Sequence, residues 1–101
     1  MIARLWHGAT PAARAQEYLR YLEQVGLPGY QGIAGFQRAQ ILTRVEGPTA
    51  HFLVVSYWDS MEAIARFAGD QIDRAQYYPR DAEFLLELEP KVLHYEVAAG
   101  S

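Results

Sequence analysis

Residues 53–63 read LVVSYWDSMEA, an apolar run that passes through Trp58 into a segment with helical spacing. The strand predicted here begins at Ala50, ends at Trp58 and is apolar on both faces. Its side chains divide into Phe52, Val54 and Trp58 on one face and Leu53, Val55 and Tyr57 on the other. A strand with two apolar faces must be covered on both of them.

A helix is predicted to follow this strand. Asp59 can cap its first turn, and Glu62, three residues later, completes a capping box. The helix is predicted to end at Gly69. Its buried face is predicted from the apolar residues at helical spacing, which are Met61, Ile64, Ala65 and Ala68.

Toward the N-terminus, residues 37–45 alternate polar and apolar side chains, which predicts a half-exposed strand. A turn at residues 46–49 joins it to the strand 50–58 as a hairpin. Further upstream, the sequence predicts a strand over Ile2–His7 and a helix that Thr10-Pro11 opens and Gly26 ends. The apolar face of this helix is formed by Ala15, Tyr18, Leu19, Leu22 and Val25.

Toward the C-terminus, the prediction is a short helix over Ile72–Tyr78, a further turn over Asp81–Leu86 and a last strand over Lys91–Ala98. The resulting order is the ferredoxin-like βαββαβ arrangement of an α+β fold, with a four-stranded antiparallel sheet. We expect a single domain over residues 1–101. Because helices cover only one face of such a sheet, two copies are expected to pair through their open faces as a homodimer.

Composition excludes several classes of function. The 101 residues carry 12 acidic and 9 basic side chains, and no basic run could follow a phosphate backbone, so no nucleic-acid partner is expected. No stretch approaches the roughly 18 apolar residues of a membrane span, so no membrane contact is expected. Cysteine is absent, which excludes disulfides and cysteine metal sites. A cytoplasmic protein is the expectation.

Three segments carry a resemblance to a known family: residues 57–63 (YWDSMEA), Phe67, and the closing strand at residues 94–97 (HYEV). On these residues the chain resembles the antibiotic biosynthesis monooxygenase family of the dimeric α+β barrel superfamily. The resemblance implies a dimer with a small pocket in each subunit, between the sheet and the helices. Family members include cofactor-free oxygenases that act on polycyclic phenols, and a haem-degrading branch.

The haem-degrading branch can be compared residue by residue. It uses an asparagine in the first strand, a tryptophan at the strand–helix junction, and a histidine about nineteen residues later. Trp58 matches the tryptophan, but Tyr77 takes the place of the histidine, and the chain contains no asparagine. The sequence therefore predicts no bound haem, although a tyrosinate can ligate haem iron. Haem binding or degradation stays a second alternative.

The candidate site combines the residue types that such an oxygenase needs. His7 is the candidate base, because an imidazole can accept a proton near neutral pH, and Trp58 and Tyr77 would position an aromatic ring. The pocket is predicted near Trp58, beneath the sheet, between the helix after Ser60 and residues 72–78. Its predicted lining is Trp6, Phe52, Val54, Ile64, Phe67 and Tyr78. No cofactor and no metal are expected.

Each of these residues also has a purely structural interpretation. Trp58 can be a core residue that fixes the start of the helix, and Tyr77 and Tyr78 can both be packed. The histidines His7, His51 and His94 lie on three different strands and are more typical of hydrogen-bonded structural groups than of a metal site. The arginines Arg4, Arg38, Arg44 and Arg80 are expected to be solvated or paired with carboxylates.

Three functional interpretations follow. The first is a cofactor-independent, monooxygenase-like enzyme acting on an electron-rich aromatic or polyketide-like molecule. The second is a noncatalytic protein that binds a small apolar or aromatic ligand. The third is a dimer with a filled core that serves as an interaction module. The size of the cavity and the titratable groups on its wall distinguish the three.

Overall fold

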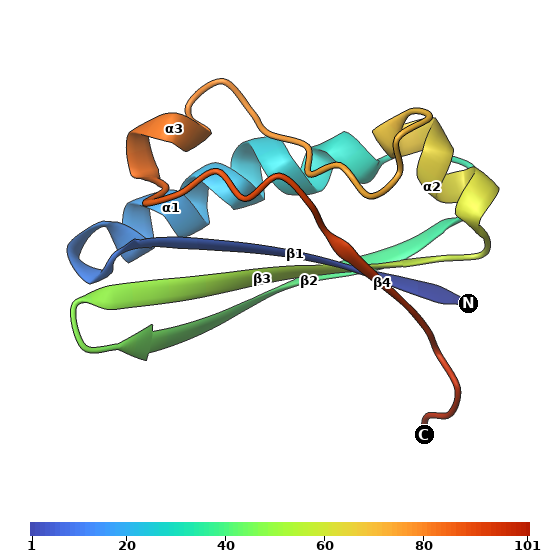
Figure 1. Ribbon diagram of the computed structural model, residues 1–101, viewed down its shortest axis with the longest axis horizontal. Helices are drawn as coiled ribbons and strands as arrows, with labels where there is room; N and C mark the ends of the chain where they lie inside the picture. The colour runs from blue at the N-terminus through green and yellow to red at the C-terminus, as the bar shows by residue number, and fades with distance from the viewer.

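The computed structural model describes the whole chain, residues 1–101. Its helices gather on one face of a single antiparallel sheet (Figure 1). The strands are β1 (Ile2–Pro11), β2 (Phe36–Glu46), β3 (Thr49–Trp58) and β4 (Leu93–Glu96), in the spatial order β2-β3-β1-β4. This is the ferredoxin-like arrangement, so the predicted fold class is confirmed.

The two central strands, β1 and β3, organise the sheet. They pair from Ile2↔Trp58 to Pro11↔Thr49, which makes β1 longer than the predicted Ile2–His7. On the helix-facing side of β3 every side chain is buried, namely Ala50, Phe52, Val54, Ser56 and Trp58. On the other side only Val55 is buried. The register places Trp6 opposite Val54, and therefore on the helix-facing side.

The first helical region is longer than predicted. It runs through η1 (Ala12–Arg14), α1 (Ala15–Tyr21), the π-helical η2 (Leu22–Gly26) and the 3₁₀-helical η3 (Leu27–Tyr30). The predicted end at Gly26 is wrong, because Gly26 keeps a helical φ of −69°. Glycine permits a break without forcing one. Pro28 lies in the first turn of η3, where its missing N–H costs no hydrogen bond.

The predicted capping of this region by Thr10 is also wrong. Thr10 is buried within β1 and its hydroxyl donates to the carbonyl of Pro11 instead of accepting from the helix. Pro11 precedes the first helical turn without a side-chain cap. The pairing of β1 with β3 along its whole length holds Thr10 in the strand.

The second main helix, α2 (Met61–Ala68), is capped by Ser60 and not by Asp59. The Ala63 N–H donates to the Ser60 hydroxyl at 3.2 Å, whereas the Asp59 carboxylate accepts a hydrogen bond from Gln37. The buried residues of α2 are Ala63 and Ile64, and Met61 is exposed. The predicted end at Gly69 is confirmed, with φ of +79°.

Residues 72–78 do not form the predicted helix. Their backbone instead bonds to the segment before β4: Val92 N–H donates to the Asp73 carbonyl at 2.8 Å, and Ala75 N–H to the Pro90 carbonyl at 2.9 Å. These tertiary hydrogen bonds outweigh a local helical preference. The short helix α3 (Asp81–Phe84) lies within the predicted turn, and β4 is shorter than the predicted last strand.

The core lies between the sheet and the helical layer. Figure 1 shows that the opposite face of the sheet carries no helix. Large apolar side chains on that open face include Leu42, Leu93 and Tyr95, which are 47%, 60% and 56% exposed. The homodimer that would cover them stays a prediction. None of the helices has both the length and the apolar character needed to cross a bilayer.

Candidate ligand-binding site

A cavity of about 40 Å³ lies between the sheet and the helices. Such a volume holds on the order of three water molecules, which is less than one aromatic ring occupies, so a ring is accommodated only when wall side chains move apart. The sheet contributes Arg4, Trp6, Ile41 and Val54 to its wall, the first helical region contributes Tyr18, Leu22, Gly26, Leu27 and Tyr30, and the remainder of the chain contributes Phe67, Gln76, Tyr78 and Asp81. The wall is mostly apolar and aromatic, with two ionisable groups of opposite sign.

The positive group is Arg4, which is only 3% exposed. Its guanidinium donates to the carbonyl of Ile72, to that of Arg74 at 3.0 Å, and to Nε2 of His94 at 3.1 Å. No carboxylate is hydrogen-bonded to it. Burial lowers the pKa of Arg4 below its ordinary value, although an arginine keeps its proton in proteins. Arg4 therefore brings a buried, incompletely neutralised positive charge to the cavity.

Trp6 lies two residues further along β1 and faces the same side. Its indole Nε1 is buried and lies toward the Tyr77 hydroxyl, but without a hydrogen bond of ordinary geometry. The ring packs edge-on against Tyr77, with centroids 6.1 Å apart, and extends over Gly8, where a Cβ atom would overlap it. A buried donor without a partner is uncommon in native proteins.

The negative group is Asp81, at the start of α3 and 2% exposed. Its carboxylate accepts hydrogen bonds from the Tyr18 hydroxyl at 2.9 Å and from the Tyr78 backbone N–H at 2.5 Å. Burial raises the pKa of Asp81 above its usual value despite these two hydrogen bonds. Burial likewise raises the pKa of Tyr30, another wall residue, to about 12.

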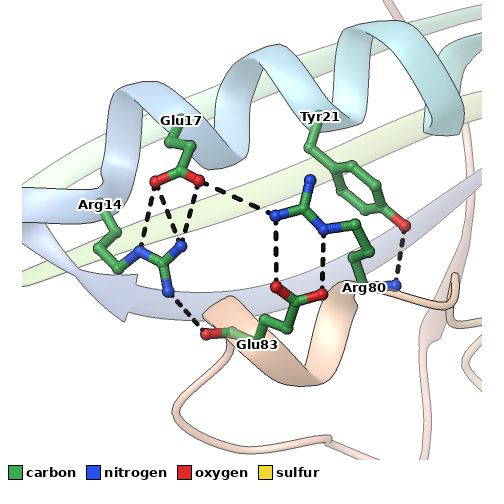
Figure 2. Close-up of polar contacts among 5 residues, drawn as sticks. All are labelled: Arg14, Glu17, Tyr21, Arg80 and Glu83. Carbon is green, nitrogen blue, oxygen red and sulfur yellow. Dashed lines mark hydrogen bonds and ion pairs between the residues drawn. The ribbon is translucent and has the colours of Figure 1, made fainter.

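Asp81 is held in place because α3 is fastened to α1 (Figure 2). Arg14 donates to the Glu83 carbonyl at 3.0 Å, and the Arg80 side chain pairs with Glu17 at 3.9 Å. The Arg80 backbone N–H also donates to the hydroxyl of Tyr21 at 3.0 Å. Each exposed ion pair contributes little by itself, but together they fix the position of α3 over the cavity.

Asp81→Asn is expected to remove a pH dependence of stability. Because the folded-state pKa of Asp81 is raised, its contribution to stability is complete below pH 3.8 and is lost as the pH rises through the folded pKa. Urea unfolding of wild type and variant between about pH 3 and about pH 7 measures this. Relative to the variant, the wild type should gain stability toward acid; a difference independent of pH would contradict the assignment, and exposed Asp70→Asn is the control.

Four of the six predicted lining residues are on the cavity wall: Trp6, Val54, Phe67 and Tyr78. The other two, Phe52 and Ile64, are fully buried in the core. Phe52 packs edge-on against Tyr18, with ring centroids 5.1 Å apart, so it supports the wall from behind. The cavity thus lies in the predicted layer but is displaced from α2 toward α1, η2 and η3.

The three predicted catalytic residues are not brought together. His7 faces the open side of the sheet, where Nδ1 lies 2.6 Å from Glu89 and Nε2 lies 3.1 Å from His51. Tyr77 donates its hydroxyl to the carbonyl of Glu89. Trp58 is fully buried behind the wall, with its indole N–H donated to the Ser56 hydroxyl at 2.8 Å. None of the three lines the cavity.

Nine of the thirteen wall residues were not among the predicted lining residues, and two of these nine, Arg4 and Asp81, carry charge. Arg4 was expected to be solvated or paired with a carboxylate, yet it shares the inward parity of Trp6 on β1. Asp81 appeared only as part of a turn, although an acidic residue at a helix start directly after Tyr77-Tyr78-Pro79-Arg80 is a position where a carboxylate can meet backbone N–H groups. The three histidines do not converge, and no group of three or more potential ligands that could hold a metal ion is present.

The fold and the cavity place the chain in a structural class, the ferredoxin-like α+β domains with a cavity beneath the sheet. The haem degrader MhuD of Mycobacterium tuberculosis, solved with two haems in its active site, matches over 100% of this chain and 99% of its own, at 19% identity and a TM-score of 0.67. A Bacillus cereus protein provisionally named an antibiotic biosynthesis monooxygenase matches over 99% and 97%, at 11% identity and a TM-score of 0.70.

These structural similarities confirm that the chain has the fold implied by the resemblance seen in its sequence. The sequence identities to these proteins are too low for their function to be assigned to this chain together with their fold. No family model matches the sequence, and no curated protein matches it. The function must therefore be argued from the cavity.

Proposed function

We propose that the chain is a cofactor-independent, monooxygenase-like enzyme that binds one compact, electron-rich aromatic or enolic molecule in this cavity. The carrying observation is the buried Asp81 carboxylate on an otherwise mostly apolar, aromatic wall. A carboxyl group with a raised pKa is a stronger base than an ordinary aspartate, which suits proton removal from a weak acid. Fold similarity to a haem degrader and to a monooxygenase-named protein supports the reaction class by analogy only.

The reaction needs no external reductant because the substrate supplies the electrons. Asp81 removes a proton, and the resulting anion transfers an electron to O₂. Recombination forms a C–O bond, the peroxide anion takes the proton back from Asp81 to become a hydroperoxide, and the hydroperoxide loses water to leave an oxidised carbon. One oxygen atom enters the product, the other leaves as water, and the substrate loses two hydrogens overall. The wall residues exclude water and hold the substrate ring. Two of them, Phe67 and Tyr30, stack on each other with ring centroids 4.8 Å apart.

Haem does not fit this site. A tetrapyrrole needs a pocket of several hundred Å³, an order of magnitude above the volume present. No histidine lines the cavity, and Tyr77, at the position of the haem-ligand histidine, has its hydroxyl bonded to the Glu89 carbonyl. We therefore assign no step to haem in this chain.

Oxygen uptake tests the proposal. Purified protein is expected to accelerate O₂ consumption by monocyclic phenols such as hydroquinone, above the protein-free rate, with hydroxylated quinone and water as products. Asp81→Asn should lower the rate by about 10²–10⁴-fold, the usual contribution of a general base. The surface change Asp70→Asn should leave the rate unchanged. Uptake that never exceeds the background rejects the enzyme proposal, and uptake that survives Asp81→Asn rejects Asp81 as the base.

One observation favours the noncatalytic alternative. The Asp81 carboxylate already accepts two hydrogen bonds, from Tyr18 and Tyr78, so it can act as a structural link between α1 and α3. In that case the same phenols bind but are not oxidised. Binding measured under nitrogen, combined with no oxygen uptake in air, assigns the chain to the ligand-binding class.

A further inference from the structure

In the state described above, the cavity is too small for any aromatic ring. Its volume is about 40 Å³, whereas an apolar cavity that holds benzene measures about 150 Å³. A single-ring ligand therefore enters only if a large side chain of the wall moves. The contacts of these side chains show which of them is held least firmly.

Most of the large wall side chains are packed on more than one side. Tyr18 and Tyr30 are buried, and Tyr30 stacks on Phe67 with ring centroids 4.8 Å apart. Trp6 lies on the central strand β1, and its ring packs edge-on against Tyr77. Displacement of any of these rings would disturb the core or the sheet.

Tyr78 is held less firmly. It is half-buried and lies in residues 75–80, which form neither helix nor strand. None of the aromatic pairs of the chain includes its ring. Its hydroxyl donates to the Gly26 carbonyl at 3.4 Å, which is longer than an ordinary hydrogen bond. The backbone N–H of Tyr78 is bonded to Asp81, so the side chain is the part that can move.

Two glycines of the first helical region provide the surface on which the Tyr78 ring rests. A Cβ at Gly26 would lie 3.8 Å from the ring atom Cε2, which is ordinary contact. A Cβ at Gly29 would lie 2.8 Å from the hydroxyl oxygen, too close for the ring to stay in place. Both glycines lie in helical turns and neither has a positive φ, so the backbone accepts an alanine at either position.

We propose that Tyr78 is the gate of the cavity and sets the size of the ligand that enters. In the closed state its side chain reaches from residues 75–80 to Gly26 and Gly29 and forms part of the wall. In the open state the side chain rotates outward, breaks the long hydrogen bond to the Gly26 carbonyl and adds its own volume to the cavity. The ligand is a compact molecule with about one aromatic ring.

The gate rests on the proposed function only for the use of its ligand as a substrate, since opening and binding need no oxygen. When the open state is populated at about 0.1–10%, the protein binds its ligand about 10- to 1,000-fold more weakly than the open state alone would. A variant that holds Tyr78 open should recover this factor.

Gly29→Ala is expected to hold the gate open. Its Cβ meets the far end of a flexible side chain, so the Tyr78 ring moves and the helical turn stays. Titration calorimetry with phenol under nitrogen should give a Kd about 10- to 1,000-fold below that of the wild type. Gly26→Ala is the matched control, because its Cβ meets the ring at an ordinary distance, and it should bind phenol as the wild type does. No gain in affinity for Gly29→Ala, or an equal gain for Gly26→Ala, overturns the gate.

A double mutant shows whether Gly29→Ala acts through Tyr78. Tyr78→Ala removes the gate and should itself bind phenol more tightly than the wild type. In that background Gly29→Ala should have no further effect on phenol binding, because its Cβ no longer meets a hydroxyl. If Gly29→Ala keeps its full effect in the absence of Tyr78, the gate is rejected.

A measurement on the wild type does not depend on whether these variants fold. In fluorine NMR spectra of protein labelled with fluorotyrosine, phenol should move the Tyr78 signal, which Tyr78→Phe identifies. The signal of Tyr95, which is exposed on the open face of the sheet, should stay in place. Phenol binding that leaves the Tyr78 signal unmoved overturns the proposal.

The two proposals fail separately. If Gly29→Ala binds phenol more tightly and no phenol is oxidised, the gate stands and the enzyme proposal is rejected. If phenols are oxidised but Gly29→Ala and Tyr78→Ala bind them as the wild type does, the enzyme proposal stands and the gate is rejected.

Discussion

Trp58→Ala is expected to lower the free energy of unfolding by about 3–5 kcal/mol, the usual cost of deleting a large aromatic side chain from a core. Trp58 is fully buried and lies among three other rings, with centroids 5.2 Å from Phe36, 5.9 Å from Tyr30 and 5.8 Å from Phe67. Two of these, Tyr30 and Phe67, also line the cavity. The substitution should therefore loosen the ligand site indirectly as well as destabilise the fold.

Trp58→Phe is the matched control for this prediction. It keeps an aromatic ring but removes the indole N–H, which leaves the buried Ser56 hydroxyl without its donor. A loss of about 1–3 kcal/mol is expected from that unsatisfied group and the smaller ring. Urea denaturation of the three proteins gives the comparison. A Trp58→Ala protein as stable as the wild type would show that the indole is not packed as described.

The strands were predictable from sequence because their side chains follow a simple period. Alternation over residues 37–45 and the apolar run from Ala50 to Trp58 led to a hairpin and to the ferredoxin-like order, since few arrangements satisfy both. The helical layer was less predictable. Gly26 and Pro28 indicate a break, yet both have backbone angles compatible with helix. Residues 72–78 have helical spacing but take their hydrogen bonds from residues 90–92, which local sequence cannot reveal.

The sequence predicted the location of the cavity between the sheet and the helices, but not which ionisable residues line it. Parity alone could not decide between Trp6 and His7, because a strand apolar on both faces does not show which face the helices cover. The register of β1 against β3 settles this in favour of Trp6. Arg4 was missed for the related reason that an arginine is expected outside, whereas its partners here are carbonyls brought in from residues 72 and 74.

Gly35→Ala is expected to destabilise the protein by about 2–5 kcal/mol, from two effects that can be separated. Gly35 has φ of +90°, a conformation that costs other residues about 1–2 kcal/mol. Its added Cβ would also lie 2.5 Å from the Cβ of Ala63, which is fully buried on α2 and cannot move aside. Overpacking of this kind adds about 1–3 kcal/mol.

Gly32→Ala isolates the backbone effect. Gly32 has φ of +79°, and no atom lies within 4 Å of where its Cβ would stand. The Gly32→Ala protein should therefore lose only the stability that the positive φ costs an alanine. In the Gly35→Ala background, Ala63→Gly removes the colliding atom and should recover the steric part, so the double mutant should be more stable than the two single changes predict. Equal losses for Gly32→Ala and Gly35→Ala, with no recovery in the double mutant, would show that α2 does not pack on Gly35. Because the Asp59 N–H donates to the Gly35 carbonyl at 2.8 Å, this contact also sets where β3 ends and α2 begins, and with it the position of Phe67 on the cavity wall.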